Sequence, residues 1–166
     1  MKSLILSFVL LISLSIDADA QKSPRVQADG EINQSKIAID YGAPSVKGRT
    51  IWGGLEAYDV IWRAGANQNT TVSFDKGVKL GGQKIAAGKY GFFIIPKKEG
   101  DWVAIFSKNN SAWGANGYNE KDDALRLNIT PEWVNENQEQ LEYSVGESAI
   151  NFAWEKARLS IPVSGL

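Results

Sequence analysis

The stretch TTVSFDKGVKLGGQKIAAGKYGFFII, which runs from Thr70 to Ile95, decides the fold class of this chain. In its first part, residues 70–75, the side chains alternate with a period of two, which is typical of a half-buried β-strand. Gly81-Gly82 separates two short strand-like runs, and because both glycines can adopt positive φ angles, the pair predicts a two-residue hairpin turn. Residues 90–95 are almost continuously apolar and predict a central strand. The stretch therefore predicts antiparallel β-structure.

The same strand-like patterns continue on both sides of this stretch. We expect further strands at residues 37–41, 60–63, 102–106, 125–129, 141–145, 150–154 and 159–163. Residues 108–123 predict a long surface loop, and the polar residues 132–140 predict one helical turn or a loop. The only other helical candidate is a turn or two around residues 54–58. Many short strands between glycine turns indicate an all-β fold, a single antiparallel β-sandwich or jelly-roll-like domain.

The first 20 residues have the pattern of a secretory signal peptide. Lys2 supplies the positive charge, an apolar run extends from Leu4 to Ile16, and Ala18-Asp19-Ala20 is a small-x-small cleavage site. We expect the mature chain to begin at Gln21, to be periplasmic or secreted, and to carry no membrane anchor after cleavage. A retained N-terminal anchor is the alternative. Within the mature chain, we predict a loose N-terminal lead-in over residues 21–34 and the β-sandwich domain over residues 35–166.

The composition excludes several kinds of site. The chain has no cysteine and no histidine, which excludes disulfides, Ser-His-Asp and Cys-His catalysis, and metals held by histidine or cysteine. Catalysis would have to use carboxylate, lysine, tyrosine or arginine side chains. The whole chain has 18 basic and 19 acidic residues, and removal of residues 1–20 takes away Lys2, Asp17 and Asp19 and leaves no net charge. We therefore expect no binding of nucleic acid or of an anionic membrane.

Several stretches resemble a known protein family. They are IDYGAPSVKGRTIWGGL at 39–55, VIWRAGAN with TT after it at 60–71, AAGKYGFFIIP at 86–96, Trp113-Gly114 followed by Tyr118, and AWEK at 153–156. With these stretches the chain is similar, over residues 25–163, to exported bacterial proteins catalogued as domain of unknown function 2911. The resemblance implies an exported protein of Gram-negative bacteria with an all-β domain. It implies no activity.

Two of the tryptophans are candidates for ligand binding. Trp62, Trp102 and Trp154 lie within strand-like alternations, so we expect them in the core. Trp113 lies in the polar loop, and Trp52 lies beside two glycines. An exposed indole ring at either place would present an apolar face to a ligand, although core packing is the alternative reading.

The arginines of the same region have two interpretations. Arg49 and Arg63 would either clamp a carboxylate or phosphate, or hold loop carbonyls and an acidic side chain in place. The acidic candidates for Arg63 are Asp40, Asp122, Asp123 and Glu155. Taken together, the predicted binding residues are Arg49, Trp52, Arg63, Asn67, Trp113 and Tyr118.

The oxygen-rich end of the loop makes a calcium site conceivable. The residues concerned are Asn116, Asn119, Glu120, Asp122 and Asp123. The spacing of a calcium-binding loop is missing, so we expect no metal, and we expect acidic residues of this loop to pair with Arg63 or Arg126 instead. We find no cofactor-binding motif.

Three functions remain open from the sequence. The first is an exported, non-enzymatic β-sandwich that binds a small molecule, a glycan or a partner protein. The second is a hydrolase or lyase that uses carboxylates, which would require two carboxylates facing each other in a cleft. The third is a structural or assembly protein, which would have a large apolar surface or an unpaired edge strand.

Overall fold

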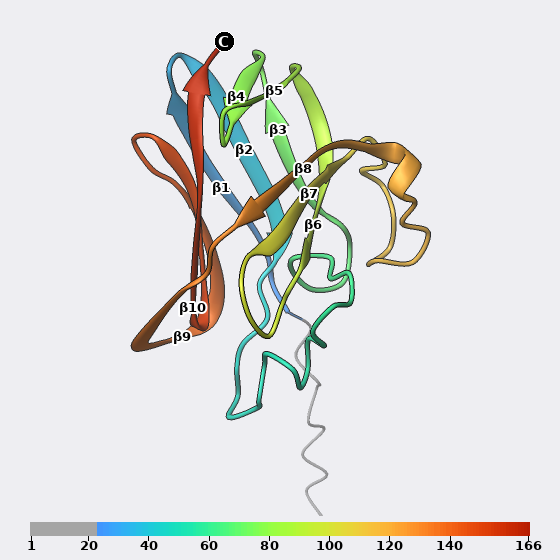
Figure 1. Ribbon diagram of the computed structural model, residues 1–166, viewed down its shortest axis with the longest axis vertical. Coiled ribbons are helices and arrows are strands. Elements are labelled where there is room, and N and C mark those ends of the chain that lie inside the picture. The colour runs from blue at the N-terminus through green and yellow to red at the C-terminus, as the bar shows by residue number, and fades with distance from the viewer. Residues whose placement is uncertain (1–22) are drawn as a thin grey trace, which may run out of the picture.

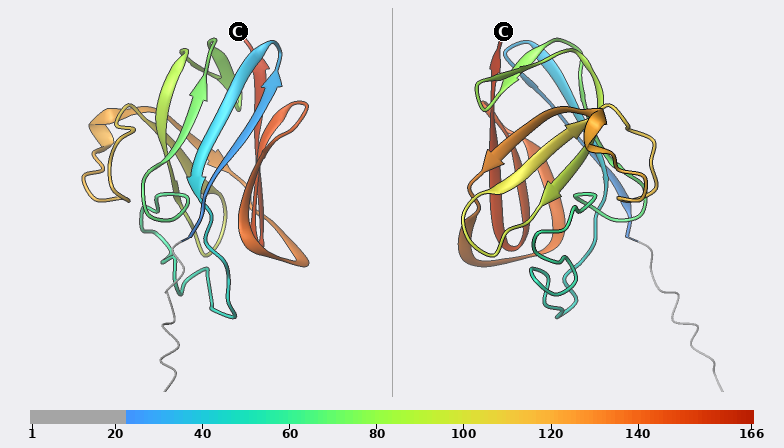
Figure 2. Two further views of the ribbon diagram at one scale, coloured as in Figure 1. Left: turned by 180° about the vertical axis from the view of Figure 1, so that it is seen from behind. Right: turned by 45° about the vertical axis from the view of Figure 1, so that its right-hand side comes forward.

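Two antiparallel sheets pack face to face in the computed structural model, which describes residues 23–166 (Figures 1 and 2). Their inward side chains form one hydrophobic core. This arrangement confirms the predicted β-sandwich. The expected signal peptide lies outside the described residues. Within residues 23–166, no helix has the length and apolar character needed to cross a membrane.

The larger sheet has the strand order β1-β2-β3-β6-β7-β8. Its strands are β1 (Arg25–Ile32), β2 (Ser35–Gly42), β3 (Thr70–Phe74), β6 (Gly88–Ile95), β7 (Trp102–Ser107) and β8 (Asp123–Ile129). The prediction of a central strand at residues 90–95 is confirmed, because β6 lies inside the sheet, between β3 and β7. The expectation of a loose lead-in is wrong for residues 25–32, because β1 pairs with β2 along its whole length. Two of the four inward positions of β1 are Ala28 and Gly30, which have little or no side chain, so its strand pattern is faint in the sequence.

The smaller sheet has the strand order β5-β4-β10-β9. Its strands are β4 (Val78–Leu80), β5 (Gln83–Ile85), β9 (Glu132–Val145) and β10 (Ala149–Gly165). The predicted hairpin is confirmed: Gly81 and Gly82 join β4 to β5 with φ angles of 53° and 84°. The prediction of a helical turn or loop at residues 132–140 is wrong, because these residues belong to β9. Both faces of this part of β9 are mostly exposed, so its sequence lacks the alternation of a half-buried strand.

Strand β10 turns back on itself. The backbone N–H of Val163 donates a hydrogen bond to the carbonyl of Ser148 over 2.8 Å, although a straight strand between these residues would span about 50 Å. The chain reverses near Glu155, which has a φ angle of 52°. Both arms pair with β9, through residues 150–153 before the reversal and residues 157–158 after it, and only the end of the second arm, residues 163–165, pairs with β4.

Residues 43–69 connect β2 to β3 and lie at one end of the sandwich, drawn in teal in Figure 1. The strand predicted at residues 60–63 is wrong: only Trp62 forms a bridge there, with Ile94 of β6. The predicted helical turn around residues 54–58 is also wrong, because this part of the chain consists of turns and a single bridge residue.

An aromatic cluster fills the core next to this connection. The ring of Trp52 lies 4.6 Å from that of Trp102, 5.6 Å from Trp154 and 5.7 Å from Trp62, measured between ring centroids. Trp62, Trp102 and Trp154 are at most 4% exposed, which confirms their predicted place in the core. Trp52 is also buried, at 8% exposed. The glycine bend therefore turns its ring inward, away from any ligand at the surface.

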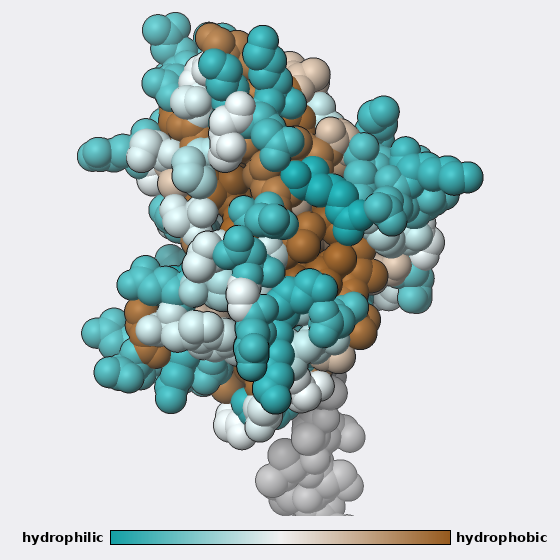
Figure 3. Space-filling model, viewed as in Figure 1, coloured by the Kyte–Doolittle hydropathy of each residue, from teal (hydrophilic) through white to brown (hydrophobic). Residues whose placement is uncertain are grey.

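The surface is mostly polar, with a band of apolar side chains across the middle of the face shown in Figure 3. The large apolar residues that remain exposed are Leu55, Val60, Trp113, Trp133 and Leu166. Trp113 is 61% exposed and Trp133 is 50% exposed. These are the two tryptophans that are available to a ligand or a partner.

Candidate functional site

A polar pocket of about 270 Å³ lies on the outer face of the larger sheet, beside the loop that contains Trp113. Strands β1, β2, β3 and β6, the chain just before β3, and this loop all contribute to it. The lining residues are Arg25, Asp40, Gln68, Asn69, Thr71, Lys89, Asn110, Ser111, Ala112 and Trp113. Most of them are polar, so the pocket offers hydrogen-bond donors and acceptors of several kinds.

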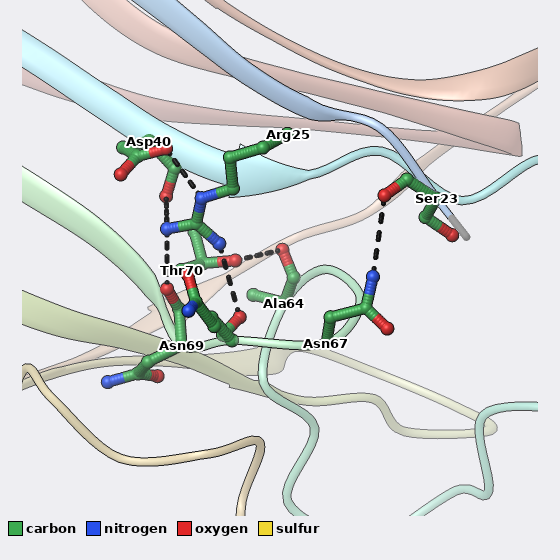
Figure 4. Close-up of polar contacts among 8 residues, drawn as sticks. Ser23, Arg25, Asp40, Ala64, Asn67, Asn69 and Thr70 are labelled. Atoms are coloured by element: carbon green, nitrogen blue, oxygen red, sulfur yellow. Dashed lines mark hydrogen bonds and ion pairs between the residues drawn. The ribbon is translucent and has the colours of Figure 1, made fainter.

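Arg25 forms one wall of the pocket. Its Nε donates to the carboxylate of Asp40 over 2.6 Å (Figure 4). Its Nη2 donates to the carbonyls of Asp40 (3.1 Å) and Asn69 (2.9 Å), and its Nη1 donates to the carbonyl of Gln68 over 3.3 Å. The guanidinium group thus joins β1, β2 and the chain that leads into β3. These contacts fix the carboxylate of Asp40 at the edge of the pocket.

The buried side chain of Asn69 lies where the loop meets the sheet. Its Nδ2 donates to the carbonyl of Asn109 over 3.3 Å. Its Oδ1 is buried and has no hydrogen-bond partner in the described part of the chain. The neighbouring Gly91 allows this close approach, because a Cβ there would lie 2.2 Å from the carbonyl oxygen of Asn109. The loop can therefore rest directly on β6.

Backbone contacts hold Trp113 at the rim of the pocket. Trp113 forms a bridge with Gln68, and the N–H of Asn69 donates to the carbonyl of Ala112 over 3.2 Å. Three residues before Trp113, Nδ2 of Asn110 donates to the carbonyl of Lys89 over 2.8 Å. The chain that leads to Trp113 is thus attached to β6 and to the segment before β3, while the indole ring remains exposed.

Arg63 and Asn67 support this loop and lie outside the pocket lining. Nη1 of Arg63 donates to the carbonyl of Asn67 over 2.8 Å. The guanidinium group lies against Gly114, where a Cβ would be 2.7 Å from Nη1. Nδ2 of Asn67 donates to the carbonyl of Ser23 over 3.4 Å (Figure 4). Of the two readings of Arg63, these contacts support the structural one, but the expected acidic partner is wrong: within residues 23–166, Arg63 forms no ion pair with Asp40, Asp122, Asp123 or Glu155.

Tyr118 anchors the far end of the same loop. Its hydroxyl donates to Oδ2 of Asp123 over 2.8 Å, and its ring lies 5.2 Å from that of Phe93 on the outer face of β6. Burial, and then the bond to Asp123, raise the pKa of Tyr118 well above its ordinary value. Asp123 also lies 3.5 Å from Nε of Arg126, and Glu120 pairs with the same arginine. This confirms the predicted pairing of the loop with Arg126.

Arg49 lies in a different corner. Its Nε and Nη2 donate to the carbonyls of Val46 (3.0 Å) and Ser45 (2.5 Å). It lines a separate pocket of about 320 Å³ together with Ser23, Pro24, Ala43, Ser45, Lys47 and Gln140. The predicted binding residues are thus divided: Trp113 lines the polar pocket, Arg63, Asn67 and Tyr118 hold its loop, Arg49 lies elsewhere and Trp52 is in the core.

Glu56 is an unusual carboxyl group that the sequence did not single out. Burial raises its pKa to about 7, and the positive charges of Arg63 and Arg49 only partly oppose this effect. Glu56 lies in the tight turn after Trp52, where its N–H donates to the carbonyl of Ile51 over 2.9 Å. It lines neither of the two pockets described above.

The other carboxylates considered from the sequence do not form a common site. Asp40 pairs with Arg25, and Asp123 bonds to Tyr118. The side chain of Glu155 accepts a hydrogen bond from the N–H of the next residue in the turn of β10. Asp122 closes the short 3₁₀ helix η1 (Glu120–Asp122). In the described part of the chain, no group of three or more acidic residues is placed to hold a metal ion.

Comparisons with known proteins identify a family and nothing more specific. Neither the curated proteins nor the solved structures contain a match to this chain. One family model matches residues 23–163, which covers nearly all of the described domain, and its description is "Protein of unknown function (DUF2911)". The chain therefore belongs to the DUF2911 family, as the resemblance of its sequence implies.

Proposed function

We propose that this protein is a non-enzymatic binding module that recognises a glycan in the polar pocket beside Trp113. The main support is the position of that indole ring, which is 61% exposed and stands at the rim of a pocket lined with amide, hydroxyl and charged side chains. A sugar ring has an apolar face of C–H groups and a polar edge of hydroxyls. Trp113 suits the apolar face, and Asp40, Lys89 and Asn110 suit the hydroxyls.

The acidic residues of the pocket favour binding over hydrolysis. Glycoside hydrolysis uses two carboxyl groups on opposite sides of the bond that breaks. Asp40 is the single acidic residue among those that line the pocket, and it is paired with Arg25. Binding without bond cleavage therefore accounts best for this arrangement.

Isothermal titration calorimetry with soluble neutral oligosaccharides tests the proposal. The probes are the cello-, xylo-, malto-, manno- and chito-hexasaccharides, and the proteins are the wild type, Trp113→Ala and Trp133→Ala. Trp133 is the matched control, because it is also an exposed tryptophan but does not line the pocket. We expect one series to bind, with affinity about tenfold or more weaker in Trp113→Ala and unchanged in Trp133→Ala. If no series binds, or if both variants lose affinity equally, the proposal is wrong.

We also propose that the protein acts after export from the cytoplasm. The support is the signal-like pattern of residues 1–20, with its cleavage site at Ala18-Asp19-Ala20. N-terminal sequencing of the protein recovered from the periplasm or the medium should start at Gln21. Recovery of the full-length chain in the cytoplasm would contradict export.

A further inference from the structure

A larger hollow continues from the polar pocket along the outer face of the same sheet. It has a volume of about 720 Å³ and lies over β1, β2, β3 and the start of β6. Its lining residues are Asp29, Gly30, Glu31, Lys36, Ile37, Ala38, Ser73, Phe74, Asp75, Gly88 and Lys89. Lys89 lines both spaces. The two hollows therefore adjoin at Lys89, and we call them together the sheet groove.

The middle of the floor of the sheet groove is low because the outward side chains there, Ala38, Ser73 and Thr71, are small. Ser73 of β3 pairs directly with Ala38 of β2 on one side and with Lys89 of β6 on the other. One step nearer to the polar pocket, Thr71 lies between Asp40 and Gly91. The 108–118 loop, which covers the sheet at Gly91, forms a wall at this end. A ligand can thus approach the sheet closely along β3.

The sheet groove is long in relation to a single sugar ring. It follows β3 from Gln68, which bridges to Trp113, to Asp75. At the rise of an extended strand this distance is about 23 Å. The groove therefore has room for several sugar residues in a row, whereas the polar pocket alone has the size for one or two.

The chemistry of the sheet groove favours a neutral polymer. Lys36 and Lys89 are opposed by Asp29, Glu31 and Asp75, so charges of both signs line it and neither dominates. The backbone groups in the middle of its floor are already paired in the ladders between β2, β3 and β6, so a peptide cannot extend the sheet there. A linear neutral glycan needs neither a strong electric field nor unpaired backbone groups beneath it.

A second feature points to a ligand at the Trp113 end of the groove. Asn69 is 3% exposed and lines the polar pocket, and its buried Oδ1 has no partner within residues 23–166. A buried amide oxygen without a donor is costly, and Asn69 lines the pocket in which the hydroxyls of a glycan would lie.

From these observations we infer that the sheet groove binds a linear, neutral glycan along its length, with Trp113 at one end and the small residues of β2 and β3 beneath the following sugars. This inference depends on the proposed function, since the glycan is held first in the polar pocket. It adds a mode of recognition, in which several neighbouring subsites bind an internal segment of the glycan chain.

The test compares ligand length in wild type, Ser73→Tyr and Asn128→Tyr, by calorimetry with the disaccharide and the hexasaccharide of the five series named above. Ser73→Tyr places a large ring on the floor of the groove and leaves the polar pocket open. Asn128→Tyr is the matched control, because Asn128 is an exposed outward residue of β8, which does not line the groove. Thermal unfolding confirms that each variant is folded.

We expect the hexasaccharide to bind wild type at least about tenfold more tightly than the disaccharide. In Ser73→Tyr this advantage should disappear while the affinity for the disaccharide stays the same, and Asn128→Tyr should behave as wild type. Equal affinities for both lengths, or no effect of Ser73→Tyr, would overturn the proposal that the glycan extends along the sheet groove. The proposal of glycan binding in the polar pocket at Trp113 would still stand. Absence of binding by all five series would overturn both proposals.

Discussion

Gly114 lies directly against the guanidinium group of Arg63. A Cβ added to Gly114 would be 2.7 Å from Nη1 and 2.8 Å from Cζ of Arg63, which is closer than carbon and nitrogen atoms can approach without a bond. The residue next to Gly114 is Trp113, the exposed tryptophan of the candidate site. The position of Trp113 therefore depends on a glycine that leaves room for an arginine.

Gly114→Ala should displace either the loop or Arg63, and Gly117→Ala should not. Both glycines have positive φ angles, 68° and 80°, so both substitutions strain the backbone by a similar amount, about 1–2 kcal/mol. Only Gly114 has neighbours within 4 Å of the added carbon. We expect a lower melting temperature and weaker glycan binding for Gly114→Ala than for Gly117→Ala. Equal values for the two variants would show that the contact with Arg63 has no consequence.

Tyr143→Phe should cost about 1 kcal/mol of the free energy of unfolding. The buried hydroxyl of Tyr143 donates to the carbonyl of Ala64 over 2.7 Å, and this carbonyl also accepts a bond from Thr70 over 3.1 Å. The carbonyl therefore keeps a partner when the hydroxyl is removed, and the loss is limited to one hydrogen bond. Urea unfolding measures the change. A loss above about 3 kcal/mol would mean that the ring position also depends on this bond.

Glu56→Gln should stabilise the protein at pH 8 and have little effect at pH 4. The folded protein holds the pKa of Glu56 at about 7, above the ordinary value of 4.5, so the folded state keeps a proton that the unfolded state loses. The stability of the wild type therefore falls as the pH rises from about 4.5 to 7. Glutamine, which carries no charge, avoids this loss. Melting temperatures of both proteins between pH 4 and 8 test this, and a constant difference across that range would contradict it.

Trp52→Ala should lower the free energy of unfolding by about 3–5 kcal/mol, because it opens a cavity in the aromatic cluster. Trp113→Ala, at a position that is 61% exposed, should change it by less than about 1 kcal/mol. Chemical unfolding of the two variants gives this comparison. Similar losses for both would indicate that the ring of Trp113 is packed against the domain in solution.

The strands with one buried face could be predicted from the sequence. The alternation of residues 70–75 and the pair Gly81-Gly82 report local geometry, and both predictions are confirmed. The first part of β9 was missed because both of its faces are largely exposed, so its side chains follow no period of two. For residues 60–63 the error was the opposite, because a strand was predicted where there is none. The pattern arises because Trp62 is buried in the core, but the backbone around it makes only one bridge.

The candidate site could be predicted only in part. Trp113 was identified because a tryptophan in a polar loop is unusual. The pocket wall formed by Arg25 was not identified from the sequence. Its partners Asp40, Gln68 and Asn69 lie 15, 43 and 44 residues away along the chain. Nothing in the local sequence reports such distant contacts. For Arg63, the sequence left two interpretations open, and its contacts with Asn67 and Gly114 support the structural one.

The reversal of β10 has a consequence for the order of folding. Its two arms, on either side of Glu155, are close in sequence and can meet within microseconds, as an isolated hairpin does. The pairing of residues 163–165 with residues 78–80 closes a far longer loop and has to follow. In refolding experiments, amide protons between the two arms should become protected first, and those of β4 should become protected together with the completed sandwich.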